Sequence, residues 1–195
     1  FFNKKLKNFR LSNIDQKIKL LRNLKVDFVI TKKFDKKFSK TKALDFIIQI
    51  LSKKLNSRFI FVSNNFRFGN RREGNVNLLK KHEKSFNYKV IKPEPLIKNK
   101  KIVSSSLIRN LLEKGFLAKA NNFLNRNWTI QGIVKKGRQV GKKIGFPTCN
   151  IDIKDYVLAK PGVYAVKVLR KNSNKYLKGI ANLGYRPTFN QKKIL

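Results

Sequence analysis

Apolar residues repeat at helical spacing in two stretches near the start of the chain. The first stripe follows Ser12, a candidate helix N-cap, and consists of Ile14, Ile18, Leu20, Leu21 and Leu24. The second stripe follows Thr41, another candidate N-cap, and consists of Leu44, Ile47, Ile48, Leu51 and Leu55. Because residues three or four apart share one face of a helix, each stripe predicts an amphipathic helix that packs on a core.

Short runs of apolar and β-branched residues predict strands at 26–31, 58–62 and 88–92. Helices that alternate with such strands favour a parallel sheet with crossover helices. From residue 125 onward the pattern changes to strands joined by turns, with strands at 129–134, 163–169 and 176–183 and a hairpin turn at Ser173 and Asn174. We therefore expect an α/β domain over residues 1–124 and a small antiparallel β-barrel over residues 125–195.

The composition is that of a globular chain. Its 195 residues are 41% hydrophobic and include 16 Phe, and no apolar run approaches the ~20 residues that span a bilayer. The single cysteine excludes an internal disulfide framework, which fits a reducing, cytoplasmic setting. We expect no membrane partner.

The formal net charge of +37 raises the possibility of a nucleic-acid-binding module. The lysines, however, are scattered through every segment instead of forming one block. We interpret the charge as a general basic bias and expect no specific nucleic-acid partner, although non-specific binding of polyanions at low salt is expected.

A glycine-rich stretch in the last third of the chain carries candidate chemistry. Gly137, Gly141 and Gly145 recur every four residues, and Lys142 lies among them. Backbone N–H groups of such a loop form a concave site for phosphate. The same composition also occurs in ordinary exposed turns.

Thr148 and Asn150 follow this loop, two residues apart. In an extended segment both side chains point to one face, where a hydroxyl and a carboxamide oxygen suit a Mg²⁺ ion that also holds nucleotide phosphates. An alternative is that the segment only begins a strand.

Two further stretches are unusual. The loop 62–74 contains two aromatic residues, three arginines and two glycines, so it is either a ligand-binding loop or a long loop that Phe66 and Phe68 anchor on the core. Ser104 and Ser105 precede an apolar stripe that ends before Gly115, and Arg109 lies one turn further on. Serines at a helix start can bind phosphate, and they can equally serve as plain caps.

Residues 141–151, which contain Gly-Phe-Pro-Thr-Cys-Asn, resemble the riboflavin kinase signature, with Cys149 in place of its alanine. Residues 161–166 and 179–189 are similar to the next two blocks of that family, in order. The resemblance implies a small β-barrel in which Thr148 and Asn150 are ligands of Mg-ATP and residues 137–145 form a flap over the phosphates.

Residues 65–74 and 103–109 resemble two motifs of the FMN adenylyltransferase half of bacterial bifunctional riboflavin kinase/FAD synthetases, although Ser63 stands where that family has glycine. This resemblance implies a nucleotidyltransferase-like, Rossmann-like domain. It implies that Asn65 contacts flavin or nucleotide and that Ser104, Ser105 and Arg109 bind ATP phosphates.

Together the resemblances imply ATP-dependent phosphorylation of riboflavin to FMN and adenylylation of FMN to FAD, with Mg²⁺ and with these small molecules as partners. The family's His-x-Gly-His element and its catalytic Glu have no counterpart here, so we expect a fragment clipped at both ends, with its catalytic groups outside the chain and little activity alone. The alternatives are a monofunctional riboflavin kinase with a degenerate front domain and a basic RNA-binding module.

Overall fold

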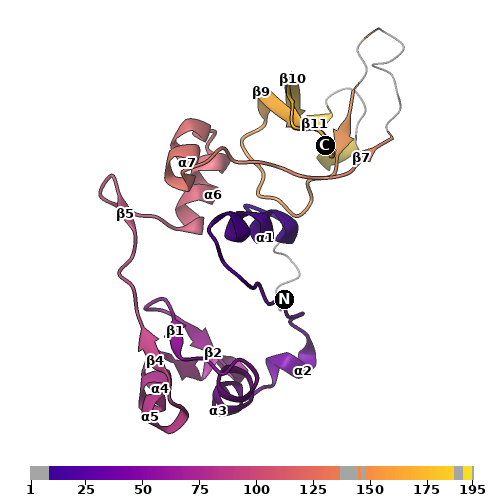
Figure 1. The fold of residues 1–195 in the computed structure, drawn as a ribbon. Coiled ribbons are helices and arrows are strands. Elements are labelled where there is room, and N and C mark those ends of the chain that lie inside the picture. Colours follow the sequence, from indigo (N-terminus) through magenta and orange to yellow (C-terminus); the bar gives the residue numbers. More distant parts are fainter. Residues whose placement is uncertain (1–8, 137–144, 146–147, 187–190, 195) are drawn as a thin grey trace. The chain divides into compact units, whose positions relative to one another are not determined.

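The computed structural model describes residues 9–136, 145, 148–186 and 191–194. The chain forms two compact units, one of residues 30–102 and one of residues 2–29 together with 103–195 (Figure 1). The helices are α1 (Ile14–Asn23), α2 (Lys36–Ser39), α3 (Ala43–Asp45), a π-helix (Phe46–Lys54), a 3₁₀-helix (Asn70–Arg72), α4 (Val76–Lys81), α5 (Glu83–Phe86), α6 (Ser105–Glu113) and α7 (Leu117–Leu124).

The strands form two-stranded sheets. One pair is parallel, β1 (Phe59–Phe61) with β4 (Lys89–Ile91). The antiparallel pairs are β2 (Arg67–Phe68) with β3 (Gly74–Asn75), β5 (Ile97–Lys98) with β6 (Lys101–Ile102), β7 (Val134–Lys135) with β8 (Asn150–Ile151), β9 (Gly162–Leu169) with β10 (Tyr176–Leu183), and β11 (Tyr185–Arg186) with β12 (Gln191–Ile194). None of these sheets closes within the described residues, so the predicted barrel is not confirmed.

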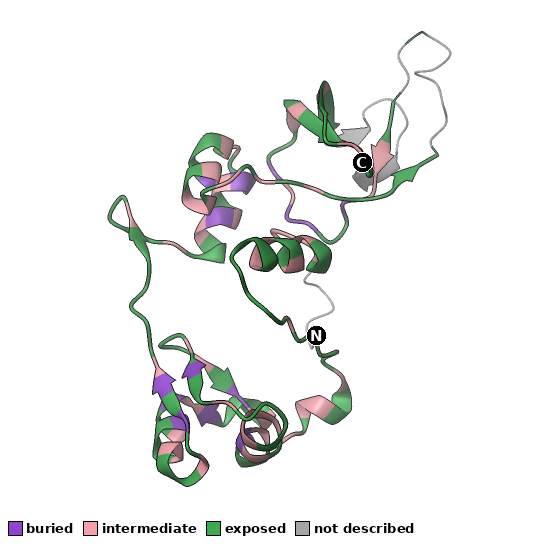
Figure 2. Cartoon of the chain, in the orientation of Figure 1, coloured by how far each residue is buried: buried purple, intermediate pink, exposed green. Residues whose placement is uncertain are grey.

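The first unit has its own apolar core beneath the parallel pair β1–β4 (Figure 2). Alternation along β1 buries Ile60, and the same alternation along β4 buries Val90, because successive side chains of a strand point to opposite faces. The core residues are Ala43, Ile47, Ile60, Phe68, Val76, Leu79, Tyr88 and Val90. Strands and helices that meet through one buried face confirm an α/β arrangement for this part of the chain.

The predicted helices exist, with corrected starts. The N-cap of α1 is Asn13 and not Ser12, because the Asn13 side chain accepts from the Gln16 N–H at 2.8 Å while Gln16 returns the bond at 2.9 Å. This reciprocal capping box outweighs the single hydroxyl that Ser12 would offer. The second stripe begins after Lys42 and not Thr41, and its main part winds as a π-helix.

The strand predicted at 26–31 is wrong: residues 26–31 have no regular structure, and Phe28 and Ile30 are 86% and 71% exposed. A strand needs a neighbour for its backbone groups, and the described residues give this segment none. Of the strand predicted at 129–134, only Val134 is in a strand. The hairpin turn lies at Lys171 and Asn172, before the predicted position, since the Ser173 N–H donates to the Arg170 carbonyl oxygen at 3.2 Å.

The predictions of β9 and β10 are confirmed, in an antiparallel pair of eight residues each. The second unit's core lies where α6 and α7 meet the segment before β9. It consists of Ile108, Leu112, Ala120, Val157 and Ala159.

Candidate functional site

The aromatic residues of the loop 62–74 anchor it on the core of the first unit. This agrees with the interpretation of a long loop that Phe66 and Phe68 fix to the core. Phe68 is buried, and its ring stacks on Phe66 with centroids 5.4 Å apart. The Phe46 ring of the π-helix also contacts Phe68, with ring centroids 5.4 Å apart. This packing fixes the loop to the core and leaves its polar residues at the surface.

The far end of the same loop is held against the start of α3. Gly69 approaches Ala43 so closely that a Cβ atom would lie 2.7 Å from the Ala43 backbone. The Asn70 N–H donates to the Thr41 carbonyl oxygen at 2.7 Å, and the Ala43 N–H donates to the Glu73 carboxylate at 2.6 Å. Glu73 thus caps a helix whose own N-cap, Lys42, makes no side-chain capping bond. Contacts with the core and with the start of α3 therefore hold both parts of the loop in place.

Between these ties the loop borders a polar pocket of about 320 Å³. Its lining residues are Asn64, Asn65, Phe66, Arg67, Arg72, Asn75, Val76 and Asn77. The predicted residue Asn65 is therefore placed beside two guanidinium groups, and its Oδ1 accepts from the Ser63 hydroxyl at 2.9 Å. The pocket offers amide donors and acceptors for a planar ring and bidentate donors for phosphate.

Arg67, Arg72 and Asn75 were not singled out from the sequence. A signal was available for Arg67, because side chains alternate along an extended segment. Phe68 is buried, so Arg67, its neighbour in β2, points to the opposite, exposed face. Arg72 carried no comparable signal, since its backbone lies in the left-handed region, with φ +62°, next to Arg71 with φ +49°.

The predicted phosphate residues of α6 lie in the second unit. The Ser104 hydroxyl caps α6 by accepting from the Leu107 N–H at 3.2 Å, so the capping interpretation is confirmed. Ser105, the first helical residue, is exposed. Arg109 is partly exposed, and its Nε donates to the Phe9 carbonyl oxygen at 2.7 Å. The guanidinium therefore has a structural partner already.

The structure describes only part of the glycine-rich loop. Gly137, Gly141 and Lys142 lie outside the described residues. Gly145 has φ +82°, and no other described residue comes within 4 Å of the position that a Cβ atom would take. Thr148 is exposed and Asn150 is half-buried at the start of β8, opposite Lys135. Two accessible oxygen-bearing side chains at this spacing fit a hard cation such as Mg²⁺.

The carboxylate nearest in sequence to these two residues is already paired. Asp152 accepts from Lys135 Nζ at 2.7 Å, and Lys154 Nζ lies 3.5 Å away. The hydrogen bond from Lys135 and the bond from the Lys154 backbone N–H lower the pKa of Asp152 to about 2. Within the described residues, no group of three or more His, Cys, Asp or Glu side chains could hold a metal ion.

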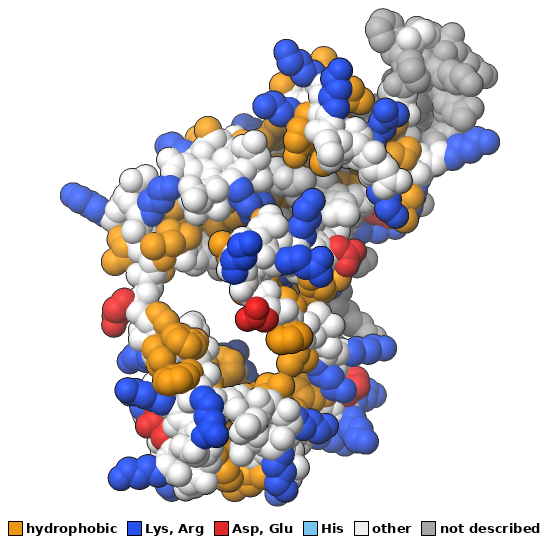
Figure 3. Space-filling model, viewed as in Figure 1, with side chains coloured by type: hydrophobic (Ala, Val, Ile, Leu, Met, Phe, Trp, Pro, Cys, Tyr) orange, Lys and Arg blue, Asp and Glu red, His pale blue; other side chains and the backbone are white. Residues whose placement is uncertain are grey.

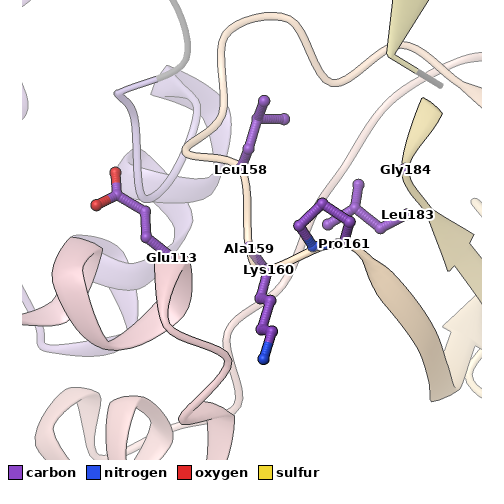
Figure 4. Close-up of a pocket in the computed structure, with 7 residues that line it drawn as sticks. All are labelled: Glu113, Leu158, Ala159, Lys160, Pro161, Leu183 and Gly184. Atoms are coloured by element: carbon purple, nitrogen blue, oxygen red, sulfur yellow. The ribbon is translucent and has the colours of Figure 1, made fainter.

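A second, smaller pocket of about 190 Å³ lies in the second unit (Figure 4). Glu113 of α6, the segment 158–161 and the residues Leu183 and Gly184 line it. Ligand pockets for molecules of nucleotide size usually exceed ~300 Å³, so this pocket is too small for such a ligand.

The basic charge forms no single patch on the face seen in Figure 3, where Lys and Arg side chains are spread among other residues of both units. Within the described part of the chain, no helix has the length and apolar character needed to cross a membrane.

Comparison with known proteins gives matches to two family models. The model described as FAD synthetase matches residues 1–107, and the model described as riboflavin kinase matches residues 124–195. These matches support a nucleotidyltransferase-like domain followed by a riboflavin kinase domain. The boundary predicted between residues 124 and 125 stays a prediction.

Curated relatives agree with both matches. A bifunctional riboflavin kinase/FMN adenylyltransferase of Buchnera aphidicola subsp. Schizaphis graminum is 39% identical over 99% of this chain and 62% of its own length. Proteins of the same name from Haemophilus influenzae and Escherichia coli K12 are 39% and 36% identical, over 93% and 92% of this chain. The chain spans 57–62% of the length of such relatives.

A solved structure named as a macrolide-efflux protein from Streptococcus pneumoniae shares the fold, with a TM-score of 0.75 over 94% of this chain and 59% of the other. At 24% identity this likeness shows the fold alone. The family models and the curated relatives together show that the chain belongs to the family of bifunctional riboflavin kinase/FMN adenylyltransferases, the FAD synthetases.

Proposed function

We propose that this chain contributes the nucleotide- and flavin-binding parts of an enzyme that phosphorylates riboflavin to FMN and adenylylates FMN to FAD, with ATP as the donor in both steps. The observation that carries the proposal is the pair of family matches, which follow one another along the chain in the order found in bifunctional relatives. A kinase with a degenerate front domain is not favoured, since residues 1–107 still match the FAD synthetase model.

For the kinase reaction, we assign Thr148 and Asn150 as residues that would hold a Mg²⁺ ion, and Gly137, Gly141, Lys142 and Gly145 as residues that would bind the ATP phosphates. The ion would neutralise charge that develops on the transferred phosphoryl group. Exposure of Thr148 and the position of Asn150 on a paired strand support the assignment, because a strand fixes the direction of the carboxamide.

For the adenylyl transfer, we assign Asn65 to flavin or nucleotide, and Ser104, Ser105 and Arg109 to ATP phosphates. The pocket around Asn65 supports the first assignment, since Arg67 and Arg72 give it positive charge and four asparagines supply hydrogen-bonding groups. The Ser63 hydroxyl, bonded to Asn65 Oδ1, would keep the Asn65 amide N–H₂ available as a donor.

The two assignments predict separable losses of activity. In the complete reading frame that contains this chain, the double variant Thr148→Ala/Asn150→Ala should lower kcat/KM for FMN formation by about 100-fold or more, equivalent to ~2.7 kcal/mol of transition-state stabilisation. Formation of FAD from supplied FMN should remain. Arg67→Ala and Arg72→Ala should lower the rate of FAD formation from FMN and leave the rate of FMN formation unchanged. Chromatographic separation of riboflavin, FMN and FAD measures both rates.

Thr129→Ala is the matched control, because Thr129 is an exposed threonine whose hydroxyl contacts only the nearby Asn127 carbonyl oxygen in the described structure. It should leave both rates unchanged. Equal losses in both reactions for the Thr148/Asn150 variant would contradict the assignment of these residues to the kinase step. Binding of RNA that persists at physiological salt, without quenching of flavin fluorescence, would instead favour the RNA-binding alternative.

A further inference from the structure

The compact units do not follow the limits of the two family matches. The second unit combines residues 2–29 with 103–195, whereas the FAD synthetase match covers 1–107 and the riboflavin kinase match covers 124–195. Residues from the first match are therefore folded together with the whole of the second. Residues 9–16, which we call the strap, make several of the contacts that join them.

The strap pairs with the kinase match through its backbone. The Arg10 N–H donates to the Asp155 carbonyl oxygen at 3.0 Å, and the Val157 N–H donates to the Arg10 carbonyl oxygen at 2.9 Å. These two bonds form a parallel bridge between Arg10 and Tyr156. Backbone groups of the strap and of residues 155–157 thus satisfy one another, as adjacent strands do.

Three side chains from other elements hold the strap in place. Trp128 Nε1 donates to the Leu11 carbonyl oxygen at 3.0 Å, and the Arg126 guanidinium donates to the Ser12 hydroxyl at 3.4 Å. From α6, Arg109 Nε donates to the Phe9 carbonyl oxygen at 2.7 Å. Burial lowers the pKa of Arg126, which shows that its charge is partly removed from water at this contact.

Tyr156 is a buried residue whose hydroxyl forms hydrogen bonds on the inner side of this contact. Its side chain is only 3% exposed, and its hydroxyl lies 2.8 Å from Gln16 Oε1 and 3.0 Å from the Gln131 carbonyl oxygen, either of which can accept its proton. The Gln131 N–H donates to the same hydroxyl at 3.1 Å. A buried hydroxyl in the kinase match is thus satisfied partly by a side chain of α1, from the other match.

Apolar packing joins the kinase match to the helices α6 and α7, whose buried residues lie between the two matches. Val157 and Ala159, from the kinase match, are buried against Ile108, Leu112 and Ala120 of α6 and α7. The Lys160 N–H donates to the Leu112 carbonyl oxygen at 3.0 Å, at the end of α6. If α6, α7 and the strap were removed, Val157 would lose the contacts that keep it fully buried.

We propose that the strap and the helices α6 and α7 form an internal docking surface for residues 153–160, so that parts of the FAD synthetase match and the riboflavin kinase match open and close as one cooperative unit. This inference does not rest on the proposed reactions, and it assigns Arg109 and Tyr156 as positioning residues of the interface. Cooperative units of this kind become visible as groups of amides that exchange together.

Hydrogen–deuterium exchange of the full 195-residue chain, read by mass spectrometry, tests the proposal with a matched pair of core substitutions. Val157→Ala should speed exchange of the strap, α6 and α7 by about tenfold or more, and leave β1 and β4 unchanged. Val90→Ala, in the core of the first unit, should speed exchange of β1 and β4 and leave the strap, α6 and α7 unchanged. The proposal is overturned if Val157→Ala affects only residues 153–160, or if it affects β1 and β4 equally.

A second pair of substitutions tests the hydrogen bonds of the interface without changing its apolar core. Tyr156→Phe retains the ring and removes only the hydroxyl, and Tyr176→Phe makes the same change at a tyrosine that is 60% exposed. Tyr156→Phe should speed exchange around Gln16 and Gln131 together, by about fivefold to tenfold, while Tyr176→Phe should not. A change at Gln131 without a change in the strap would show that the strap only lies beside the kinase segment.

Discussion

Single residues set the shape of the candidate site through contacts that reach across the sequence. Glu73 caps a helix that begins thirty positions earlier along the chain, and Gly69 lets the aromatic loop lie directly against Ala43. Neither residue has a predicted chemical role. Their effect is to hold the loop so that Asn65 and Arg67 face the pocket.

Two glycines with similar positive φ angles should differ in their tolerance of alanine. At Gly69, with φ +76°, a methyl group would also collide with Ala43, so Gly69→Ala should lower the free energy of unfolding by about 2–4 kcal/mol. At Gly145, with φ +82°, no atom of the described residues lies within 4 Å of the new Cβ, so Gly145→Ala should cost only about 1 kcal/mol. Urea unfolding of both variants measures the difference, and equal losses would contradict the close approach to Ala43.

Tyr88 should make the stability of the first unit depend on alkaline pH. Burial, with a smaller effect of the Glu83 charge, raises the pKa of Tyr88 from 10.0 to about 12. The unfolded chain therefore releases this proton first, and the stabilisation is complete below pH 10 and is lost as the pH rises towards 12.

The substitution Tyr88→Phe should remove that pH dependence. At pH 7 it should cost about 1 kcal/mol, because the hydroxyl donates to the Leu79 carbonyl oxygen at 2.7 Å. Urea unfolding at pH 7 and pH 11 checks both statements, with the exposed Tyr176→Phe as the control that should follow the original chain. A Tyr88→Phe variant that loses as much stability at pH 11 as the original chain would disprove the role of Tyr88.

At the scale of elements, α6 shows a helix whose two ends are specified locally. Ser104 caps the start, and the end has a Schellman arrangement in which Gly115, with φ +83°, donates to the Leu112 carbonyl oxygen and Phe116 donates to that of Leu111. The same N-terminus is the predicted phosphate site. Capping and phosphate binding are compatible, because a helix start has more than one free N–H group.

Two substitutions at Ser104 separate these roles. Ser104→Ala removes the cap and should lower stability by about 1 kcal/mol. Ser104→Asp keeps a capping oxygen and should leave stability nearly unchanged, but its negative charge should weaken ATP binding about tenfold if phosphates bind at this helix end. Thermal unfolding measures the change in stability, and calorimetric titration with ATP measures the change in ATP affinity. Unchanged ATP affinity in Ser104→Asp would remove Ser104 from the phosphate site.

At the scale of the whole molecule, two cores divide the chain in a way that its linear order conceals. The first unit is continuous in sequence, whereas the second joins residues 2–29 to 103–195. The proposed cooperative unit follows from this division. Charge is organised differently, since the visible Lys and Arg side chains are spread over both units and do not mark either core (Figure 3).

Predictions from the sequence succeeded where the signal was local. The caps and stops of α6 and the alternation along β9 and β10 involve residues a few positions apart, and these elements were found where expected. The strand predicted at 26–31 failed because a strand also requires a distant partner. For the candidate site, the sequence motifs predict Asn65 and Ser104, and their roles stay predictions, whereas the place of Arg72 depends on loop packing.

Periodicity in the sequence predicted α1, the helical stretch after Lys42, and the strands β9 and β10, and motifs that lie in order along the chain identified the FAD synthetase family. The pairing of the strap with residues 155–157 and the bond from Tyr156 to Gln16 became visible only in the folded chain. The physical reason is separation along the chain: contacts between residues more than a hundred positions apart depend on the complementarity of folded surfaces, and no local pattern records it.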